Sequence, residues 1–228
     1  MASGKVAVGT YRLLADRQMR RWELQHRIGA PARPLPCVAI SRLPGAGGAE
    51  VGRRVAEALD YGFFGRETVD EMGRGLGVED WLMNGLDEHV RNAIDRFVLD
   101  FFTHRRFTES DYLRHVTRAI ATLGRRGSAV IVGRGAAFIL SAEEALRVLL
   151  VAPRPARIER YAEVKEVSAE QAEHMIERAE EQRGEFLQAQ FGVRQDDPIL
   201  YDLMINTARF GFDNSATLIL EALRSRFS

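Results

Sequence analysis

The stretch Cys37-Val-Ala-Ile-Ser-Arg-Leu-Pro-Gly-Ala-Gly-Gly-Ala-Glu-Val-Gly52 is an apolar run that ends in a glycine cluster and passes directly into a helical repeat. This layout predicts a buried strand over residues 37–41, a loop, and a helix over 49–59. Glycine tolerates positive φ angles, so the backbone N–H groups of such a loop can turn inward around an anion at the start of the helix. The segment therefore predicts a phosphate-binding loop made of Gly45, Ala46, Gly47, Gly48 and Ala49.

The loop lacks the lysine, and the serine or threonine after it, that a Walker A sequence places behind its last glycine. Ala49 and Glu50 follow the glycines instead. The chain has only two lysines, Lys5 and Lys165, so a phosphate site must take its cationic side chains mainly from arginine, whose fork geometry suits phosphate oxygens. A plain glycine-rich turn is the alternative. A dinucleotide fingerprint fits less well, because its third glycine position holds Glu50.

The composition is that of an ordinary folded protein of 228 residues, 46% hydrophobic and 28% charged. A chain of this length can bury one substantial core. Lysine plus arginine and aspartate plus glutamate both number 32, and this zero net charge argues against a nucleic-acid partner. The histidines show no metal-ligand spacing, so no structural zinc is expected.

The amino terminus has no signal-peptide apolar centre, and no apolar run approaches the ~20 residues that span a bilayer. We therefore expect a cytoplasmic protein with no membrane partner. The single cysteine, Cys37, agrees with a reducing compartment, and its place in an apolar strand favours a buried, inert thiol.

Residues 1–36 are predicted to form a basic helix, over 10–28, and a connector that contains Pro31, Pro34 and Pro36. The segment holds seven basic groups and two acidic ones. Packing on the body or on another subunit is the favoured role, so a homo-oligomer formed through this helix is one hypothesis. A membrane surface or nucleic acid is the alternative partner of its basic face.

Residues 37–228 are predicted to form one α/β domain, because further apolar strands over 61–64, 129–132, 147–151 and 203–206 alternate with helical patterns. Such alternation implies parallel pairing with right-handed crossovers. A helical insert is predicted over about 66–126, with an apolar and aromatic stripe that belongs to the core. A helical lid is predicted over about 154–192, with a capping box between Ser168 and Gln171, and a final helix from about Asp213.

Three motifs follow one another along this domain. They are Ser41-Arg42 followed by Pro-Gly-Ala-Gly-Gly, then Val130-Ile-Val-Gly-Arg-Gly-Ala-Ala-Phe-Ile-Leu140, then Tyr201-Asp-Leu-Met-Ile-Asn-Thr207. Together they resemble the cytidylate-kinase-like family, a branch of the P-loop nucleoside monophosphate kinases, over roughly residues 37–226. The resemblance implies an α/β protein with a three-layer α/β/α, P-loop NTPase-like fold: a parallel five-stranded sheet, a monophosphate-binding helical insert and a mobile helical lid.

The sequence departs from the bacterial cytidylate kinases that it resembles at two places. In those enzymes the third strand leads into Gly-Arg-Asp, whose arginine and aspartate serve the acceptor nucleotide, whereas Gly133-Arg134-Gly135 keeps the arginine and lacks the carboxylate. Their Asp-Ser-Gly after the second strand is replaced by Phe64-Gly65-Arg66. These differences leave the acceptor base open.

By this resemblance the chain would transfer the γ-phosphoryl group of ATP, with Mg²⁺, to a pyrimidine nucleoside monophosphate such as CMP. Such chemistry needs in-line positioning and positive charge around the transferring oxygens. The predicted catalytic residues are Arg42, in place of the missing lysine, and Arg157, Arg160 and Arg183 of the lid, while Arg66 and Arg134 are predicted to bind the acceptor phosphate. The sequence identifies no metal ligands.

Two other functions are compatible with the same residues. The missing lysine and the missing loop hydroxyl for Mg²⁺ would suit a nucleotide-binding regulatory or assembly protein without kinase turnover. An oligomeric scaffold that keeps the glycine loop for its shape alone is the third hypothesis.

Overall fold

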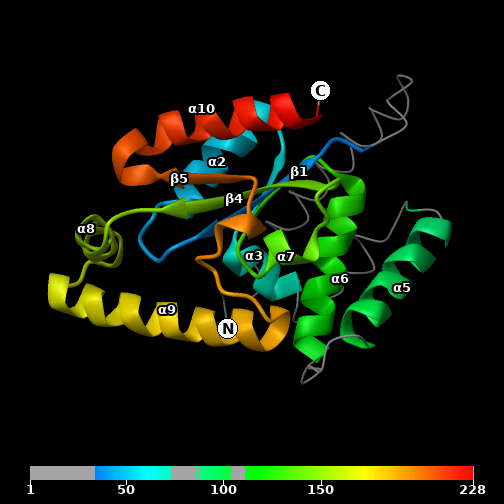
Figure 1. The fold of residues 1–228 in the computed structure, drawn as a ribbon, viewed down its shortest axis with the longest axis horizontal. Coiled ribbons are helices and arrows are strands. Elements are labelled where there is room, and N and C mark those ends of the chain that lie inside the picture. The colour runs from blue at the N-terminus through cyan, green and yellow to red at the C-terminus, as the bar shows by residue number, and fades with distance from the viewer. Residues whose placement is uncertain (1–33, 73–85, 87, 104–110, 228) are drawn as a thin grey trace, which may run out of the picture.

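The computed structural model describes residues 34–72, 86, 88–103 and 111–227 (Figure 1). The strands are β1 (Cys37–Arg42), β2 (Gly62–Phe64), β3 (Ala129–Val132), β4 (Ala145–Val151) and β5 (Leu203–Asn206). The helices are α2 (Gly48–Leu59), α3 (Arg66–Met72), α5 (Glu88–Thr103), α6 (Asp111–Arg126), α7 (Ala136–Ile139), α8 (Arg154–Lys165), α9 (Ala169–Phe191) and α10 (Thr207–Phe227). The predicted basic helix over 10–28 lies outside the described residues.

The strands form one parallel five-stranded sheet with the order β2-β3-β1-β4-β5, as the sequence predicted. Val38 of β1 pairs with Val130 on one side and with Leu146 on the other. Because β1 is central, its apolar run is buried on both faces of the sheet. The strand boundaries are close to those predicted, although β4 begins at Ala145 instead of Arg147.

Successive side chains of the central strand enter two separate cores. Val38 and Ile40 join the core that α2 and α10 cover, whereas Cys37 and Ala39 join the core of α6 and α7. Figure 1 shows α2 and α10 on one face of the sheet and α6 and α7, backed by α5, on the other. The predicted three-layer α/β/α fold is therefore confirmed.

Cys37, at the start of the central strand, has no exposed surface. Its Sγ lies 3.5 Å from the carbonyl oxygen of Leu123 on α6. Burial raises the pKa of the thiol to about 12, so the reactive thiolate is scarcely populated near neutral pH. The prediction of a buried, inert cysteine is confirmed.

The predicted insert is helical where the structure describes it, as α3, α5 and α6. Ile94, Phe101 and Ile120 of its apolar stripe are buried. The ring of Phe101 packs edge-on against Phe191 at the end of α9, with 5.9 Å between the centroids. The stripe thus belongs to the core, as predicted. Across the described part of the chain, no helix combines the length and apolar character needed to cross a membrane.

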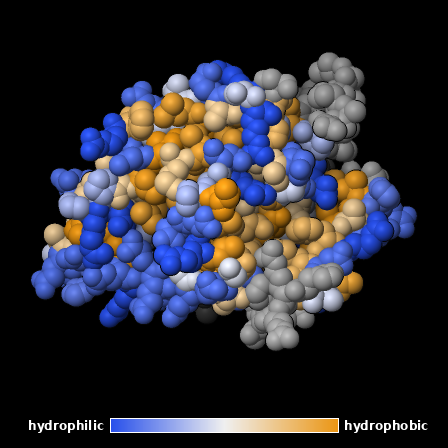
Figure 2. Space-filling model, in the orientation of Figure 1, coloured by the Kyte–Doolittle hydropathy of each residue, from blue (hydrophilic) through white to orange (hydrophobic). Residues whose placement is uncertain are grey.

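The predicted lid consists of α8 and α9, which follow the carboxyl end of β4 (Figure 1). The predicted capping box joins them: the Gln171 backbone N–H donates to Ser168 Oγ at 3.2 Å, and the Ser168 N–H donates to Gln171 Oε1 at 3.1 Å. Most of the surface seen over α9 is hydrophilic (Figure 2). Two arginines of this helix pair contact the segment that leads into the glycine loop: Arg157 donates to the carbonyl oxygen of Pro44, and Arg183 donates to that of Arg42.

The last helix consists of a short first turn and a longer second part. α10 starts at Thr207 and breaks at Gly211, whose φ of 71° and ψ of 175° are open almost only to glycine. The Thr207 hydroxyl lies 3.0 Å from the Ala46 carbonyl oxygen and 3.2 Å from that of Val151, which ties the helix start to the glycine loop. The predicted final helix from about Asp213 agrees with the longer part behind the break, while the short turn from Thr207 before the break was not predicted.

Gly127, in the turn between α6 and β3, provides a test of this packing. Its φ of +71° is left-handed, and an added Cβ would overlap the carbonyl oxygen of Leu35. Gly127→Ala should therefore lower the free energy of unfolding by about 2 kcal/mol or more. Gly184→Ala on α9, where an added Cβ meets nothing within 4 Å, should raise it by about 0.5–1 kcal/mol. Urea unfolding measures both values, and equal effects of the two variants would contradict the described turn.

Candidate functional site

The candidate site lies at the carboxyl ends of β1 and β3, where the connections of the sheet diverge. The chain passes from β1 into α2 on one face and from β3 into α7 on the other. Ligands of open parallel sheets bind in the crevice that such a divergence creates. A cavity of about 250 Å³ lies here, lined by Ser41 and Arg42 of β1, by residues 133–135 after β3, by Arg66 of α3 and by one face of α9.

The glycine loop lies next to Arg42, one of the cavity-lining residues, on the α2 side. Gly45 and Gly47 have φ angles of 80° and 77°, and Gly47 is the residue before the first turn of α2. The loop therefore presents the amino-terminal end of a helix of 12 residues, an arrangement that favours anions. The predicted loop over 45–49 does not itself line the cavity. A ligand on the loop and a ligand in the cavity would thus be neighbours.

Arg42 connects the two places. Its aliphatic stem packs on Gly48 at the start of α2, where an added Cβ would lie 2.8 Å from Arg42 Cγ. Its guanidinium lies against Gly133, where an added Cβ would overlap Nη1. The side chain therefore runs from the glycine loop to the turn after β3. The sequence predicted a cation near the phosphates here, and the structure places one between the loop and the cavity.

The cavity is strongly positive because four of the six predicted arginines line it: Arg42, Arg66, Arg134 and Arg183. Burial, followed by repulsion from Arg183, Arg66 and Arg134, lowers the pKa of Arg42 to about 9. Burial, followed by repulsion from Arg66, lowers the pKa of Arg183 to about 10. Both groups remain protonated at neutral pH. The arrangement favours a ligand that carries more than one negative charge.

The turn after β3 is built to aim Arg134 into the cavity. Gly133, Arg134 and Gly135 have φ angles of 87°, 52° and 75°, three left-handed residues in a row. An added Cβ on Gly135 would overlap the ring of Phe191, so glycine is required there by its surroundings as well as by its φ angle. Arginine in this conformation costs roughly 1 kcal/mol, and strain of this kind is common at ligand sites.

Asp70 on α3 belongs to the site, and sequence reasoning missed it. Both of its carboxylate oxygens contact the guanidinium of Arg134, and Oδ2 lies 3.7 Å from Arg66 Nε. The hydroxyl of Tyr112 on α6 donates to Asp70 Oδ1 at 2.8 Å. Burial and this hydrogen bond raise the pKa of Tyr112 to about 12, so the phenol stays a donor. The only sequence signal was the i, i+4 spacing of Arg66 and Asp70.

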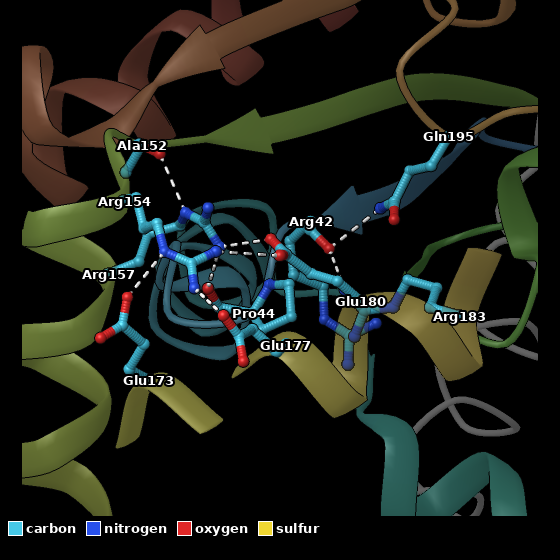
Figure 3. A network of polar contacts seen from close by, with 10 residues as sticks. All are labelled: Arg42, Pro44, Ala152, Arg154, Arg157, Glu173, Glu177, Glu180, Arg183 and Gln195. Carbon is cyan, nitrogen blue, oxygen red and sulfur yellow. Dashed lines mark hydrogen bonds and ion pairs between the residues drawn. The ribbon is translucent and has the colours of Figure 1, made fainter. Parts of the chain in front are cut away.

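Arg183 reaches the site from α9. Its Nη1 donates to the carbonyl oxygen of Arg42 at 2.5 Å, and Nε2 of Gln195 donates to the same oxygen at 3.0 Å (Figure 3). The guanidinium also lines the cavity. The lid therefore contributes a cation to the cavity, and it also binds the backbone carbonyl oxygen of Arg42, the last residue of β1.

Arg157 of α8 lies apart from this cavity, beside Ala152, Pro44 and Glu180 (Figure 3). Its Nε donates to the Ala152 carbonyl oxygen at 3.0 Å, and its Nη1 donates to that of Pro44 at 3.2 Å. The same Nη1 pairs with Glu180 of α9 at 2.6 Å. The side chain is almost fully buried by these partners and does not line the cavity. Its predicted catalytic role stays a prediction, while its contacts are those of a structural tie between lid and loop.

Arg160 also lies on the loop side. Its Nη2 pairs with Glu50 of α2 at 3.0 Å, and its guanidinium stacks 4.0 Å above the ring of Phe212. That ring fills the space beside Gly47, where an added Cβ would overlap it. The lid arginines thus divide between two places: Arg183 lies at the cavity, while Arg157 and Arg160 lie at the loop. The predicted role of Arg160 stays a prediction.

A resident metal site is not evident in the part of the chain that the structure describes. No group of three or more histidine, cysteine, aspartate or glutamate side chains gathers there in a way that could hold an ion. Glu50, the carboxylate nearest the loop in sequence, is paired with Arg160. A divalent ion at the loop would depend on ligands from a bound polyphosphate.

Comparison with known proteins gives a family and a fold. The model of the cytidylate kinase-like family matches residues 37–209. A cytidylate kinase of Methanopyrus kandleri is 26% identical over 200 residues, which cover 82% of this chain and 92% of that protein. One of Halobacterium salinarum is 27% identical over 186 residues, covering 82% and 88%. The crystal structure of an uncharacterized protein from Eubacterium ventriosum has the same fold, with a TM-score of 0.64 at 19% identity and coverage of 83% and 99%.

The lowered pKa of Arg42 leads to a stability prediction. Because its pKa falls on folding, the charged form costs stability at every pH below about 9, and this cost shrinks as the pH rises further. Inorganic phosphate should raise the Tm of the parent protein by binding among the guanidinium groups. Arg42→Met should leave the ligand-free Tm unchanged or higher and should remove most of the phosphate effect.

Thermal unfolding over a phosphate titration at pH 7 measures both quantities. Arg224→Met, at an exposed position on α10 paired with Glu221, serves as the control and should respond to phosphate as the parent does. An Arg42→Met variant with a lower ligand-free Tm and an undiminished response to phosphate would show that Arg42 has a structural role instead.

Proposed function

The chain belongs to the cytidylate kinase-like family, and on this premise we propose that it transfers the γ-phosphoryl group of ATP to the phosphate of a nucleoside monophosphate. The observation that supports the proposal is that two places suited to anions lie next to each other: a glycine loop at a helix start and a cavity lined by four arginines. Phosphoryl transfer requires two anionic substrates held in line with positive charge between them. Arg42 lies between the two sites.

In this proposal the donor phosphates bind the backbone N–H groups of residues 45–49, as anions do at helix starts. The acceptor phosphate binds in the cavity to Arg66 and Arg134. Arg42 and Arg183 then face the oxygens of the group in transfer, where their charge offsets the charge that spreads over the transition state. Burial strengthens this effect because the interaction is less screened by water.

Mg²⁺ would enter with ATP as part of the substrate. The loop offers no serine or threonine hydroxyl behind its last glycine, and the described carboxylates form no ligand cluster. The polyphosphate would therefore supply most of the ligands of the ion. The ion would neutralise part of the phosphate charge, and the arginines of the cavity would neutralise another part.

We further propose a pyrimidine acceptor, with CMP, dCMP and UMP as the first candidates, and a cytoplasmic location. The support for the acceptor is the family and the cytidylate kinases among its relatives. The carboxylate that bacterial cytidylate kinases carry after the arginine is absent at Gly135. The base preference must therefore come from other residues around the cavity.

One observation favours a nucleotide-binding protein without turnover as the second candidate. Arg157, which would be expected to close over the transferring group, is instead buried between Ala152, Pro44 and Glu180. Together with the missing lysine, this leaves the loop with fewer cations than phosphoryl transfer normally uses. Such a protein would bind ATP and leave it intact.

A direct assay separates the two candidates. The purified protein with ATP, Mg²⁺ and a panel of nucleoside monophosphates should convert at least one of them to its diphosphate. Arg134→Ala should raise the KM for that monophosphate by ~10-fold or more with a smaller change in kcat, because it removes binding present before the transition state. Arg224→Ala should match the parent. If ATP binds but no monophosphate is phosphorylated above a protein-free blank, the kinase proposal is overturned in favour of the non-catalytic one.

A further inference from the structure

We infer that Asp70 is a positioning residue of the cavity: it holds one edge of the Arg134 guanidinium so that the other edge is presented to an anionic ligand. The inference rests on the proposed function only in taking that anion to be the phosphate of the acceptor.

The contacts of Asp70 define which edge is held. Nη2 of Arg134 donates a hydrogen bond to Oδ2, and Nε forms an ion pair with Oδ1, so both carboxylate oxygens lie along the side edge of the guanidinium. Both side chains are largely buried, with exposed fractions of 17% for Asp70 and 21% for Arg134. This pairing leaves the Nη1 donors of Arg134 outside the carboxylate contact. One edge of the Arg134 guanidinium is therefore occupied by Asp70, while the Nη1 donors on the other edge are available to an anionic ligand.

Asp70 is itself fixed by a second helix of the insert. The Tyr112 hydroxyl of α6 donates to Oδ1 at 2.8 Å, and the Tyr112 ring lies 6.0 Å from the guanidinium carbon of Arg134. Arg66, one turn earlier on α3, adds an ion pair at 3.7 Å. A carboxylate held by these two groups can keep a long side chain such as Arg134 in one rotamer. The insert and the turn after β3 are thereby coupled through Asp70.

Such a holder is needed because the surrounding charges oppose the observed arrangement. Arg42 and Arg183 repel the Arg134 guanidinium, and its backbone is left-handed. Without a carboxylate, an arginine side chain so placed would gain by turning toward solvent. Asp70 offsets the repulsion before any ligand arrives, so the binding anion does not have to order Arg134.

The opposite role is also chemically reasonable and predicts the opposite result. A carboxylate on Arg134 could imitate the ligand and compete with it, so that its removal would tighten anion binding. The contacts of Asp70 favour positioning, because its carboxylate pairs with the side edge of the Arg134 guanidinium and accepts a hydrogen bond from Tyr112. Removing the carboxylate should then weaken binding.

The experiment measures the affinity of the full-length protein for inorganic phosphate by calorimetry, without turnover. Asp70→Asn should weaken phosphate binding by ~10-fold, and Tyr112→Phe should weaken it by ~2- to 5-fold. Asp70→Glu should recover part of the loss. The matched control is Asp95→Asn, which removes an exposed carboxylate paired with Arg118 elsewhere in the insert, and it should bind phosphate as the parent does.

Unchanged or tighter phosphate binding in folded Asp70→Asn would overturn the inference, and so would a parent protein that does not bind phosphate. If Asp70→Asn fails to fold, unchanged binding in both Tyr112→Phe and Asp70→Glu would overturn it. Weakened binding in a parent that phosphorylates no monophosphate would support the inference while the proposed function fails. With an active acceptor, Asp70→Asn should raise the KM for the acceptor, leave the KM for ATP unchanged and change kcat less.

Discussion

Repulsion among buried guanidinium groups is the constraint on which the site depends. Arg42, Arg66, Arg134 and Arg183 meet at the carboxyl ends of β1 and β3, and burial lowers the pKa of Arg42 and Arg183 well below the usual value for arginine. Asp70 is the carboxylate that contacts two of the four. A site with this imbalance would be stabilised by an anionic ligand.

The parallel sheet explains why these groups meet. β1 is followed by the glycine loop and β3 by the left-handed turn, and the two strands are hydrogen-bonded neighbours. The lid then binds the same strand end through backbone carbonyl oxygens, with Arg183 on the carbonyl of Arg42 and Arg157 on that of Pro44 (Figure 3). The lid, the loop and the turn are therefore all in contact with Arg42 or with its neighbour Pro44. A change in the position of α9 must alter the contacts of the loop as well as those of the cavity.

Local patterns were sufficient to predict the strands, the glycine loop, the capping box and the buried thiol, because each depends on neighbours in sequence. Tertiary contacts decided the rest. Arg157 and Arg160 lie in the helical lid as predicted, but the sequence could not show that their side chains lie at the loop instead of the cavity. Asp70 was missed because its partners Arg134 and Tyr112 are distant in the chain. The break at Gly211 hid the start of α10.

The central claim is that the glycine loop and the arginine cavity act as two halves of one phosphoryl-transfer site. Hydrogen exchange with a bisubstrate analogue, adenosine joined to cytidine through five phosphates, tests it most directly. We expect slower exchange at three places together: the loop over 45–49, the turn over 133–135 and the part of α9 around Arg183. Slower exchange confined to the loop, with the turn and α9 unchanged at saturation, would contradict the account, because it would mean that the cavity receives no acceptor.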